Sequence, residues 1–398
     1  MIKKAQVSIV KCEKIHRYES VKKAVKDSLD LIGGLDSLVS AGDRILIKPN
    51  LIAPYHYRTG ATTSPLVIRA LCALAKKAGA VRVSIADGSA VGHKTEQVFA
   101  VTGLKELSAR IGVALIDFKK AKAVPIGIPN GKIFRRIKIP QIFMEADVII
   151  NVPVMKTHDV FPATLGLKNM KGILQEKDKK RFHKWGLAQS IVDLNKLVLP
   201  QITVLDGTVC MEGMGPTHGT PVNLAIIISS LDTVAADTVA AAVMGIDPLR
   251  IEYLKLAFEQ ELGCADLSRI QVLGTGIEKV KRPFKQVELD SEFWKEKGIE
   301  IYEKGACSGC RNTVISFIVN IEKNEDRPEL LKGYTLIFGQ NVKLPDKCKG
   351  KLVSIGLCTG KFRGKGGYIP GCPPHPQDIL DFFEKMGKSS KQNQLPFR

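Results

Sequence analysis

The chain has 398 residues, of which 44% are hydrophobic and 25% are charged, and its formal net charge is +19. This length suits two domains with sizeable cores, and no segment approaches the ~18 uninterrupted apolar residues of a membrane span. We therefore expect no membrane contact. The N-terminus lacks the apolar run and cleavage site of a signal peptide, and together with nine cysteines this predicts a reducing, cytoplasmic location.

The positive charge raises the question of nucleic-acid binding. Lys and Arg are spread along the chain, however, and the sequence has no helix-turn-helix, RRM or zinc-finger pattern. Only 6% of the residues are aromatic, too few to indicate a platform on which bases stack. A basic, well-solvated surface is the favoured interpretation, and no nucleic-acid partner is expected.

Segments rich in valine and isoleucine predict strands, the first of them at the N-terminus. The strands expected after it are Ile45–Lys48, Val81–Ala86, Asp147–Val152, Ile202–Leu205 and Leu224–Ile228. Between the strands, the spacing of amphipathic helices occurs at Ser64–Ala78, Glu96–Ile111 and Leu187–Leu197. This alternation predicts an α/β fold, with a large, mostly parallel sheet and helices on both of its faces.

A different composition begins after Pro283. There we expect a helix from about Asn312 to Glu322, strands at Tyr334–Phe338 and Leu352–Ile355, and a final helix over Pro376–Lys385. These elements predict a small, cysteine-rich α/β domain. The boundary is expected in a charged stretch, which gives a large domain over residues 1–288 and a small domain over residues 289–398.

Polar residues repeatedly follow the predicted strands of the large domain. The four motifs are Lys48-Pro-Asn50, Asp87-Gly88-Ser89, the segment from Asn151 to His158, and Asp206-Gly207. Ligands of open parallel sheets gather at the carboxyl ends of the strands. Each motif alone could be a turn or a helix cap, but four in succession favour a pocket.

The segment after the third motif adds lysines and histidines. Lysines here are suited to neutralise a carboxylate or a phosphate, and Gly172 would allow close backbone approach. The predicted anion-binding residues are Lys48, Asn50, Lys168, Asn169 and Lys171. The predicted catalytic residues are His158, as the proton donor, with Lys156 and Asp206. The target is an anionic small-molecule substrate.

Several neighbouring residues have more than one interpretation. His158 and His183 could be acid–base groups, metal ligands, or simply satisfied core or surface residues. We interpret the Lys179–Arg181 run as a solvated loop. The acidic residues Asp206, Glu212 and Asp237 could bind a divalent cation or orient a lysine, although Asp237 fits equally well as an ordinary helix residue.

Five of the nine cysteines lie in the small domain: Cys307, Cys310, Cys348, Cys358 and Cys372. Thiolates bind zinc or iron–sulfur clusters, and a C-x-x-C pair can give two ligands to one centre. A zinc ribbon usually supplies a second such pair, whereas the other cysteines here are well separated. We predict a [4Fe-4S] cluster bound by Cys307, Cys310, Cys358 and Cys372, with Cys348 in reserve. Zinc and reduced structural thiols stay as alternatives.

Basic residues surround the last cysteines. They are Lys343, Lys347, Lys349, Lys351, Lys361, Arg363 and Lys365. A positive rim around a redox centre would attract an acidic electron carrier such as a ferredoxin. A solvated loop is the alternative, and the sequence supports both equally.

Short motifs of the large domain carry a family resemblance. They are Ile47–Leu51, Met155–His158, Gly166–Gly172, His183, Asp206–Gly207, Met211–Pro216 and Asp232–Asp237. With them, the chain from about Ile45 to Gly274 resembles the DUF362 family, prokaryotic proteins often associated with iron–sulfur domains. The resemblance implies the domain and no established reaction.

The small domain departs from the ferredoxin-type C-x2-C-x2-C-x3-C-P runs that many members of that family carry. Its Cys307/Cys310, Cys358 and Gly371-Cys372-Pro373-Pro374 layout is more similar to the cluster-bearing subunits of hydrogenases and respiratory complex I, which share a Gly-Cys-Pro-Pro loop. The likeness covers few residues and carries over no hydrogenase or quinone chemistry.

The leading hypothesis is an iron–sulfur oxidoreductase. Its cluster would pass single electrons between an external carrier and an anionic substrate or cofactor in the large domain. One alternative is a dehydratase or isomerase whose cluster acts as a Lewis acid. Another is a non-enzymatic electron carrier or assembly factor. The sequence has no P-loop, complete dinucleotide fingerprint or G-x-S-x-G motif.

Overall fold

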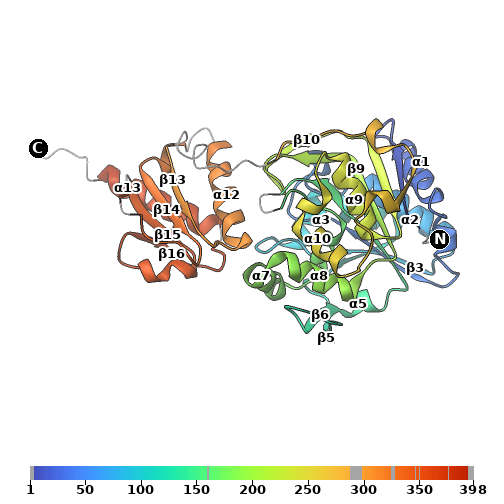
Figure 1. Cartoon of the computed structure of the whole chain (residues 1–398), viewed down its shortest axis with the longest axis horizontal. Coiled ribbons are helices and arrows are strands. Elements are labelled where there is room, and N and C mark those ends of the chain that lie inside the picture. Colours follow the sequence, from blue (N-terminus) through green and yellow to red (C-terminus); the bar gives the residue numbers. More distant parts are fainter. Residues whose placement is uncertain are drawn as a thin grey trace, which may run out of the picture. The chain divides into compact units, whose positions relative to one another are not determined.

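The computed structural model of the chain describes residues 4–158, 161–286, 298–323, 328–345, 347–348, 350–374 and 376–392. The chain divides into two compact units, Met1–Val287 and Glu288–Arg398. We call them the large and the small domain, and both are drawn in Figure 1. Among the described residues, no helix is both long and apolar enough to cross a membrane.

The large domain is built on a ten-stranded sheet. Its strands are β1 (Ala5–Lys11), β2 (Arg44–Pro49), β3 (Arg82–Asp87), β4 (Ala114–Asp117), β7 (Val148–Val152), β8 (Val154–Lys156), β9 (Ile202–Glu212), β10 (Thr220–Val222), β11 (Ile226–Ser230) and β12 (Ile270–Gly274). Their order is β12-β1-β11-β9-β7-β2-β3-β4, with β8 and β10 paired to β9. Among the described residues of this sheet, the antiparallel pairs are β1–β11, β9–β11 and β9–β10, and the other pairs are parallel. The predicted mostly parallel sheet is confirmed.

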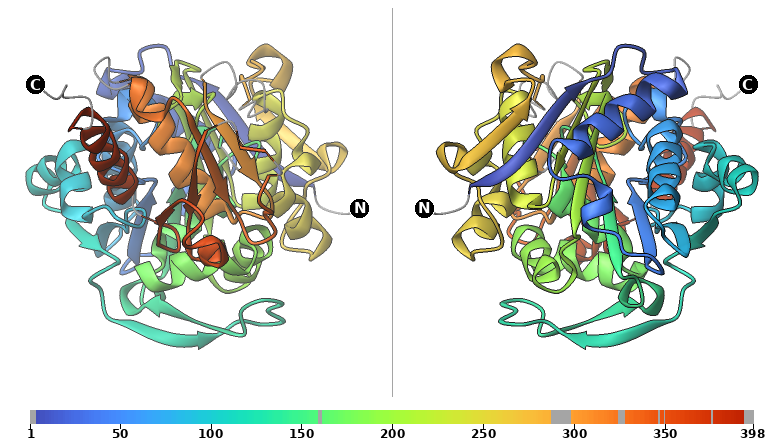
Figure 2. Two further views of the ribbon diagram at one scale, coloured as in Figure 1. Left: turned by 90° about the vertical axis from the view of Figure 1, so that its left-hand side faces the viewer. Right: turned by 90° about the vertical axis from the view of Figure 1, so that its right-hand side faces the viewer.

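Helices cover both faces of the large sheet, as Figure 2 shows. One apolar core contains residues of α1 (Tyr18–Asp30), α2 (Pro65–Lys77), α3 (Thr95–Val101) and α4 (Leu104–Ile111). The other contains residues of α6 (Gly166–Asn169), α8 (Leu187–Val198), α9 (Thr233–Val243) and α10 (Glu252–Glu259). The single helix predicted over Glu96–Ile111 is broken into α3 and α4 at Gly103, whose φ of 76° does not fit a right-handed helix.

A hairpin and a charged helix complete this domain. Strands β5 (Ala123–Gly127) and β6 (Arg136–Pro140) form an antiparallel hairpin that projects from the body of the domain (Figure 2). Helix α5 (Gln141–Met144) follows it, and α7 (Glu176–Trp185) lies beyond α6 in the chain. Phe134 stacks on Phe182 and Trp185 of α7, with ring centroids 4.8 Å and 5.3 Å apart. These rings fix α7 despite its charged sequence.

The small domain has a four-stranded sheet in which every pair is parallel. Its strands, in spatial order, are β13 (Glu300–Glu303), β14 (Tyr334–Phe338), β15 (Lys351–Ile355) and β16 (Gly367–Ile369). Helix α12 (Ser308–Lys323) follows β13, and α13 (Pro376–Gln392) follows β16. Phe383 of α13 stacks on Phe317 of α12 and contacts Tyr334 edge-on. The predicted small α/β domain is present.

Candidate functional site

The first candidate site lies at the carboxyl ends of β2, β3 and β7, which are parallel neighbours. Lys48, near the end of β2, donates from Nζ to Oδ1 of Asp87 at the end of β3, over 2.8 Å. Both side chains are buried, at 0% and 2% exposure. Burial lowers the pKa of Lys48, and the Asp87 charge opposes that shift. An ion pair so deep in the domain fixes the two strand ends to each other.

Amide side chains connect this ion pair to α6. Asn169 Oδ1 accepts hydrogen bonds from Asn50 Nδ2 at 2.9 Å and from Lys48 Nζ at 3.4 Å. Asn169 Nδ2 donates to Asn151 Oδ1 at 2.8 Å. Two predicted anion-binding residues, Asn50 and Asn169, thus lie beside Lys48. Oδ1 of Asn50 is buried and has no hydrogen-bond partner among the residues that the structure describes.

Further lysines gather around this network. Lys156, at the end of β8, is fully buried and donates to the carbonyl oxygen of Ala61 at 2.6 Å. Burial, and then the charge of Lys168, place the pKa of Lys156 well below its ordinary value. Lys168 is half-buried and donates to Thr164 Oγ1 at 3.1 Å. The structure brings these two predicted residues close enough to influence each other's charge.

Lys171 lies in a short 3-10 turn, η3 (Met170–Ile173), which follows α6. Its Nζ contacts Nε2 of His183 in α7. Burial, and then the charges of Lys168 and Lys179, hold the pKa of Lys171 well below its usual range. Burial, Lys171, Lys168 and His158 lower the pKa of His183 in the same way. The predicted His158, Lys168 and Lys171 are therefore within electrostatic reach of His183.

Lys179 belongs to the same group, and the interpretation of Lys179–Arg181 as a solvated loop is wrong. The run lies in α7, where Lys179 is 4% exposed. Its Nζ donates to the carbonyl oxygens of Gly88 and Ser89, at 2.6 Å and 2.8 Å. Burial lowers its pKa from 10.5 to about 7. Lys179 and His183 are four residues apart on a helix, and this spacing is the signal that could have placed both on one face.

We call this group of five lysines and two histidines the lysine edge. It consists of Lys48, Lys156, Lys168, Lys171, Lys179, His158 and His183. Within the described ranges, Lys156, Lys171 and Lys179 form no ion pair with a carboxylate. Buried, unpaired cations are costly unless they lose a proton or meet an anion. The arrangement is therefore suited to bind a carboxylate or a phosphate.

Asp206 does not join the lysine edge. The prediction that its strand ends at Asp206-Gly207 is wrong, because β9 continues, buried throughout, to Glu212. Asp206 accepts hydrogen bonds from the backbone N–H of Ser64 at 2.7 Å and from the hydroxyl of Thr208 at 2.6 Å. Ser64 is the N-cap residue immediately before α2. These contacts give Asp206 a structural role, and its predicted catalytic role stays a prediction.

The other two acidic residues have partners of their own. Glu212 forms a bidentate pair with Arg282, at 2.7 Å and 3.0 Å. Asp237 accepts from the backbone N–H groups of Gly166 and Leu167 at 2.6 Å and 2.9 Å, and burial raises its pKa to about 7. Asp237 thereby fixes the start of α6, which carries Lys168 and Asn169. Glu212, Asp237 and Asp206 thus each stabilise a different part of the large domain.

The second candidate site lies in the small domain, and we call it the cysteine edge. Cys307 and Cys310 follow β13, Cys358 follows β15, and Cys372 follows β16. Because all four strands are parallel, these cysteines come after carboxyl ends that meet at the same edge of the sheet. Cys348 precedes β15 and is exposed, so it lies toward the opposite edge. None of the nine cysteines forms a disulfide.

Loop contacts bring the cysteine-bearing segments together. Leu357 N–H donates to Gly371 O at 2.9 Å, which joins the loops of Cys358 and Cys372. A Cβ atom at Gly356 would lie 3.3 Å from the Cys310 sulfur, so a glycine leaves that sulfur room. The thiol of Cys310 hydrogen-bonds to Cys307 and lowers its pKa to about 6. That bond, burial, and the charges of Cys307, Cys372 and Cys358 raise the pKa of Cys310.

The arrangement does not form a site for a single ion. Among the described residues, no group of three or more His, Cys, Asp or Glu side chains is placed to hold one metal ion. The thiolate ligands of a [4Fe-4S] cluster each bind a different iron, so they lie further apart than the ligands of a lone zinc. Four cysteines that follow strand ends at one edge match the number of ligands that such a cluster uses.

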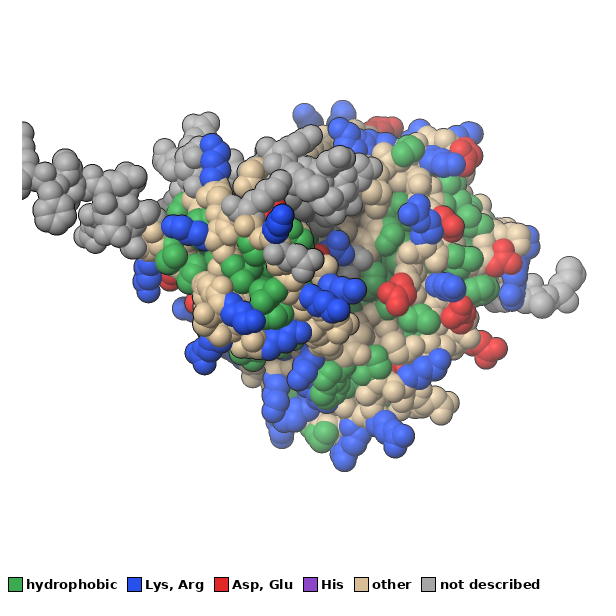
Figure 3. Space-filling view, turned by 60° about the vertical axis from the view of Figure 1, so that its left-hand side comes forward, with side chains coloured by type: hydrophobic (Ala, Val, Ile, Leu, Met, Phe, Trp, Pro, Cys, Tyr) green, Lys and Arg blue, Asp and Glu red, His purple; other side chains and the backbone are tan. Residues whose placement is uncertain are grey.

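The predicted basic rim divides between the two edges of the small sheet. Lys361 lies in a 3-10 helix, η8 (Leu357–Phe362), and donates to the carbonyl oxygen of Gln340, just beyond the end of β14. Lys351 begins β15 and Lys365 precedes β16, so both lie toward the opposite edge. Lys349 lies outside the described residues. On the face of the molecule drawn in Figure 3, Lys and Arg side chains are scattered rather than gathered in one patch.

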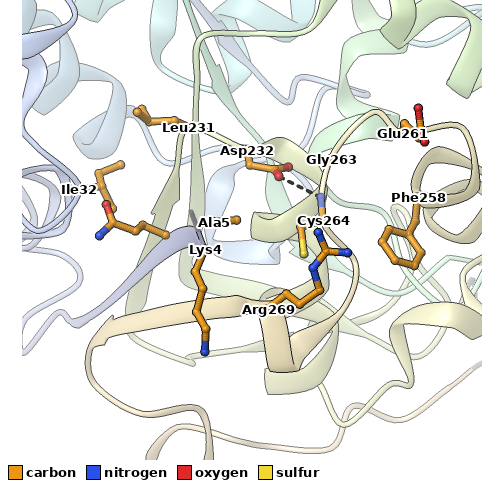
Figure 4. Close-up of a pocket in the computed structure, with 11 residues that line it drawn as sticks. Lys4, Ala5, Ile32, Leu231, Asp232, Phe258, Glu261, Gly263, Cys264 and Arg269 are labelled. Atoms are coloured by element: carbon orange, nitrogen blue, oxygen red, sulfur yellow. Dashed lines mark hydrogen bonds between the residues drawn. The ribbon is translucent and has the colours of Figure 1, made fainter. Parts of the chain in front are cut away.

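A hollow of about 830 Å³ lies at the other edge of the large sheet, where β1 and β12 begin and β11 ends. Figure 4 shows its lining, which includes Lys4, Phe258 and Arg269. The carboxylate of Asp232 is already engaged there, because it accepts from the backbone N–H groups of Ala235 and Cys264 at 3.0 Å and 2.9 Å. The lysine edge is the stronger candidate, since its polar groups converge.

Comparison with known proteins finds a family match within the large domain. Residues 45–242 match the family described as a domain of unknown function, DUF362. The thylakoid-associated protein sll1697 of Synechocystis sp. is 28% identical over 250 residues, which cover 61% of this chain and 75% of that protein. The lactate racemase apoprotein from Thermoanaerobacterium thermosaccharolyticum aligns with a TM-score of 0.40 and 14% identity, over 61% of this chain and 57% of its own.

Proposed function

Because residues 45–242 form a DUF362 domain, attached to a domain with four thiols at one sheet edge, we propose that the chain is an iron–sulfur redox enzyme. The small domain would hold a [4Fe-4S] cluster at Cys307, Cys310, Cys358 and Cys372. The lysine edge of the large domain would bind the anionic substrate or cofactor that exchanges electrons with it. An acidic carrier such as a ferredoxin would be the external partner.

The observation that carries the proposal is the common edge of the four cysteines. Two thiols stand at the start of α12, where backbone N–H groups of Gly309 and Cys310 hydrogen-bond to the sulfur of Cys307. Such N–H groups favour the thiolate form that binds iron. Gly356 precedes the loop of Cys358, and an added Cβ there would lie 3.3 Å from the Cys310 sulfur, so the glycine leaves space beside that thiol. When bound, the cluster would supply one-electron transfer.

The lysine edge supports the substrate part of the proposal. Among the described residues, Asp87 forms an ion pair with Lys48, and no carboxylate forms one with Lys156, Lys171 or Lys179. Lys168 and Lys171 are half-buried, so they lie nearer to solvent than the buried Lys156 and Lys179. An anion at this point would recover the electrostatic cost of the buried lysines.

The test is metal analysis of the full chain purified without oxygen. We expect about four irons and four acid-labile sulfides per chain, and an EPR signal after reduction. Serine at Cys310 or Cys358 should remove most of the iron. Cys348→Ser is the matched control, because Cys348 lies toward the other edge, and it should keep its iron. Stoichiometric zinc without sulfide would contradict the proposal, as would equal iron loss in the Cys348→Ser control.

A further inference from the structure

One stretch of the large domain carries many positive charges and no negative one. From Phe118 to Met144 the sequence contains seven Lys and Arg residues and neither Asp nor Glu. The stretch includes strands β5 and β6. Their hairpin lies at the margin of the domain and projects from it in both views of Figure 2. The net charge of the chain is therefore strongly one-sided at this hairpin.

The register of the hairpin leaves two cations on its outer face without partners. Arg136 and Lys138 are exposed, whereas Ile137 between them is buried. The residues paired with them across the hairpin are Gly127 and Pro125. A carboxylate at either position could neutralise its neighbour, but glycine and proline cannot. Among the residues that the structure describes, neither Arg136 nor Lys138 forms an ion pair.

A buried carboxylate anchors the hairpin to the domain. Asp193 of α8 is fully buried. It accepts hydrogen bonds from the backbone N–H groups of Lys132, Ile133 and Phe134, at 3.0 Å, 2.6 Å and 3.0 Å. A two-stranded hairpin alone is only marginally stable in water. These bonds and the buried inner side chains therefore keep the hairpin ordered, with its cations toward solvent.

Helix α7 extends the basic surface and adds an aromatic ring. Its Lys177 and Lys184, seven positions apart and so on one face of the helix, are both exposed. Trp185 is 46% exposed. Its ring stacks on Phe134 of the hairpin loop, with centroids 5.3 Å apart, and the guanidinium of Arg181 lies 4.6 Å from its centroid. Tryptophan that is apolar on one side and wet on the other is typical of the membrane–water interface.

We propose that this surface docks on a membrane of anionic phospholipid. We call it the basic face, and it consists of Lys132, Arg135, Arg136, Lys138, Lys177, Lys184 and Trp185. The cations contact lipid phosphates, and the indole lies among the headgroups. The expected lack of membrane contact rests on spanning segments, and docking at a surface needs none. The proposal is independent of the cluster and of the lysine edge.

Two features favour lipid over other polyanions. The ring of Trp185 already stacks on Phe134 and Arg181, so a nucleic-acid base would compete with both for it. The centre of a protein–protein interface is usually depleted of charged residues. The basic face instead has six cations and one large apolar side chain. A bilayer surface accommodates this composition, because charge attraction and a shallow aromatic contact are enough to bind it.

The experiment is vesicle co-sedimentation of the full chain. Vesicles of phosphatidylcholine with about 30% phosphatidylglycerol should bind the chain, and phosphatidylcholine alone should not. The chain has two tryptophans, so Trp294→Phe leaves the emission of Trp185 as the signal. This emission should shift to shorter wavelength on binding, because the indole leaves water. Both measurements need no change in the basic face itself.

Charge variants then locate the contact. Arg136→Gln with Lys138→Gln should weaken binding about tenfold or more, since each cation near an anionic surface contributes to affinity. The control is Lys105→Gln with Arg110→Gln, which removes the same charge from exposed positions of α4. It should weaken binding much less. Circular dichroism of each variant checks that the fold is kept.

Four results would overturn the proposal. Equal losses in the two double variants would mean that the net charge of the chain binds the vesicles. Unchanged emission of Trp185 on bound vesicles would place the contact elsewhere. Tighter binding to duplex DNA than to the anionic vesicles at equal salt would assign the basic face to nucleic acid. No binding to anionic vesicles even at low salt would leave an acidic protein as its partner.

Discussion

The two candidate sites use the same topological position in different ways. Both the lysine edge and the cysteine edge follow the carboxyl ends of parallel strands. At the lysine edge the fold itself supplies partners, as in the Lys48–Asp87 pair and the hydrogen bonds from Lys179 to Gly88 and Ser89. At the cysteine edge, Cys307 and Cys358 are half-buried and Cys372 is exposed, with glycines beside them.

The two sites therefore differ in what holds their side chains in place. The lysine edge is part of the large domain's packing, so changes there should alter folding stability as well as ligand binding. The cysteine edge contributes little apolar burial, so changes there should alter what the domain binds more than how it folds. The predictions below test this contrast, first at the lysine edge and last at the cysteine edge.

The largest effect is expected from Asp87→Asn. The variant leaves Lys48 buried at 0% exposure with no opposing charge. Removing one partner of a buried ion pair typically costs about 3–5 kcal/mol. Urea unfolding of the large domain should show a loss of this size. The double variant Lys48→Met with Asp87→Leu should recover part of it, because no unpaired charge is left.

The matched control is Asp147→Asn. Asp147 pairs with Arg44 at 2.9 Å, but the two side chains are 39% and 47% exposed. Solvent screens such a pair, so Asp147→Asn should lower the free energy of unfolding far less than Asp87→Asn does. A similar loss of stability in both variants would contradict the view that the buried pair organises the lysine edge.

Much of the fold could be predicted from the sequence. Runs of Val and Ile such as Asp147–Val152 predicted strands that the structure contains, and their alternation with helices predicted the parallel sheet. The end of β9 could not be predicted, because Asp206-Gly207 has the composition of a turn. The strand continues there since Asp206 finds partners in Ser64 and Thr208, and Ser64 lies 142 positions away in the chain.

The lysine edge was predicted in part. Lys48 and Lys156 lie at the ends of strands, and the rule for parallel sheets predicted that they would lie at the same edge. Lys179 was missed because α7 is mostly charged and has few apolar residues to reveal its buried face. Its burial depends on carbonyl oxygens of Gly88 and Ser89, about ninety residues earlier. The sequence around Lys179 therefore contains no signal of these hydrogen-bond partners.

The next prediction concerns pH and tests the burial of Lys179. Its pKa falls from 10.5 to about 7 on folding because of burial. Between these values the unfolded chain holds a proton that the folded chain has lost. Burying this group therefore destabilises the folded chain, and the cost falls by up to about 1.4 kcal/mol per pH unit as pH rises from about 7 toward 10.5.

Lys179→Met should remove this slope. Urea unfolding at a series of pH values between 7 and 10.5 gives the difference between variant and original chain. Lys180→Met is the control, because Lys180 is 48% exposed and lies on the same helix. The difference in free energy of unfolding between variant and original chain should depend on pH for Lys179→Met and not for Lys180→Met. If it is independent of pH for both variants, the Lys179 side chain does not lose its proton on folding.

The smallest effect is expected at the cysteine edge, from Lys361→Glu. Opposite charges accelerate the encounter of two proteins, and at physiological salt the effect extends about 8 Å. Lys361 is exposed and lies at the cysteine edge, whereas Lys365 lies toward the other edge. Reversal at Lys361 should slow cluster reduction by an acidic ferredoxin several-fold at low salt, and reversal at Lys365 should slow it less. The difference should vanish at high salt, because salt screens the charges. It should also vanish with dithionite, because this small reductant does not dock as a protein donor does. Equal rates for the two variants would mean that carriers do not approach the edge that holds the four thiols, and the basic residues would then be solvated surface.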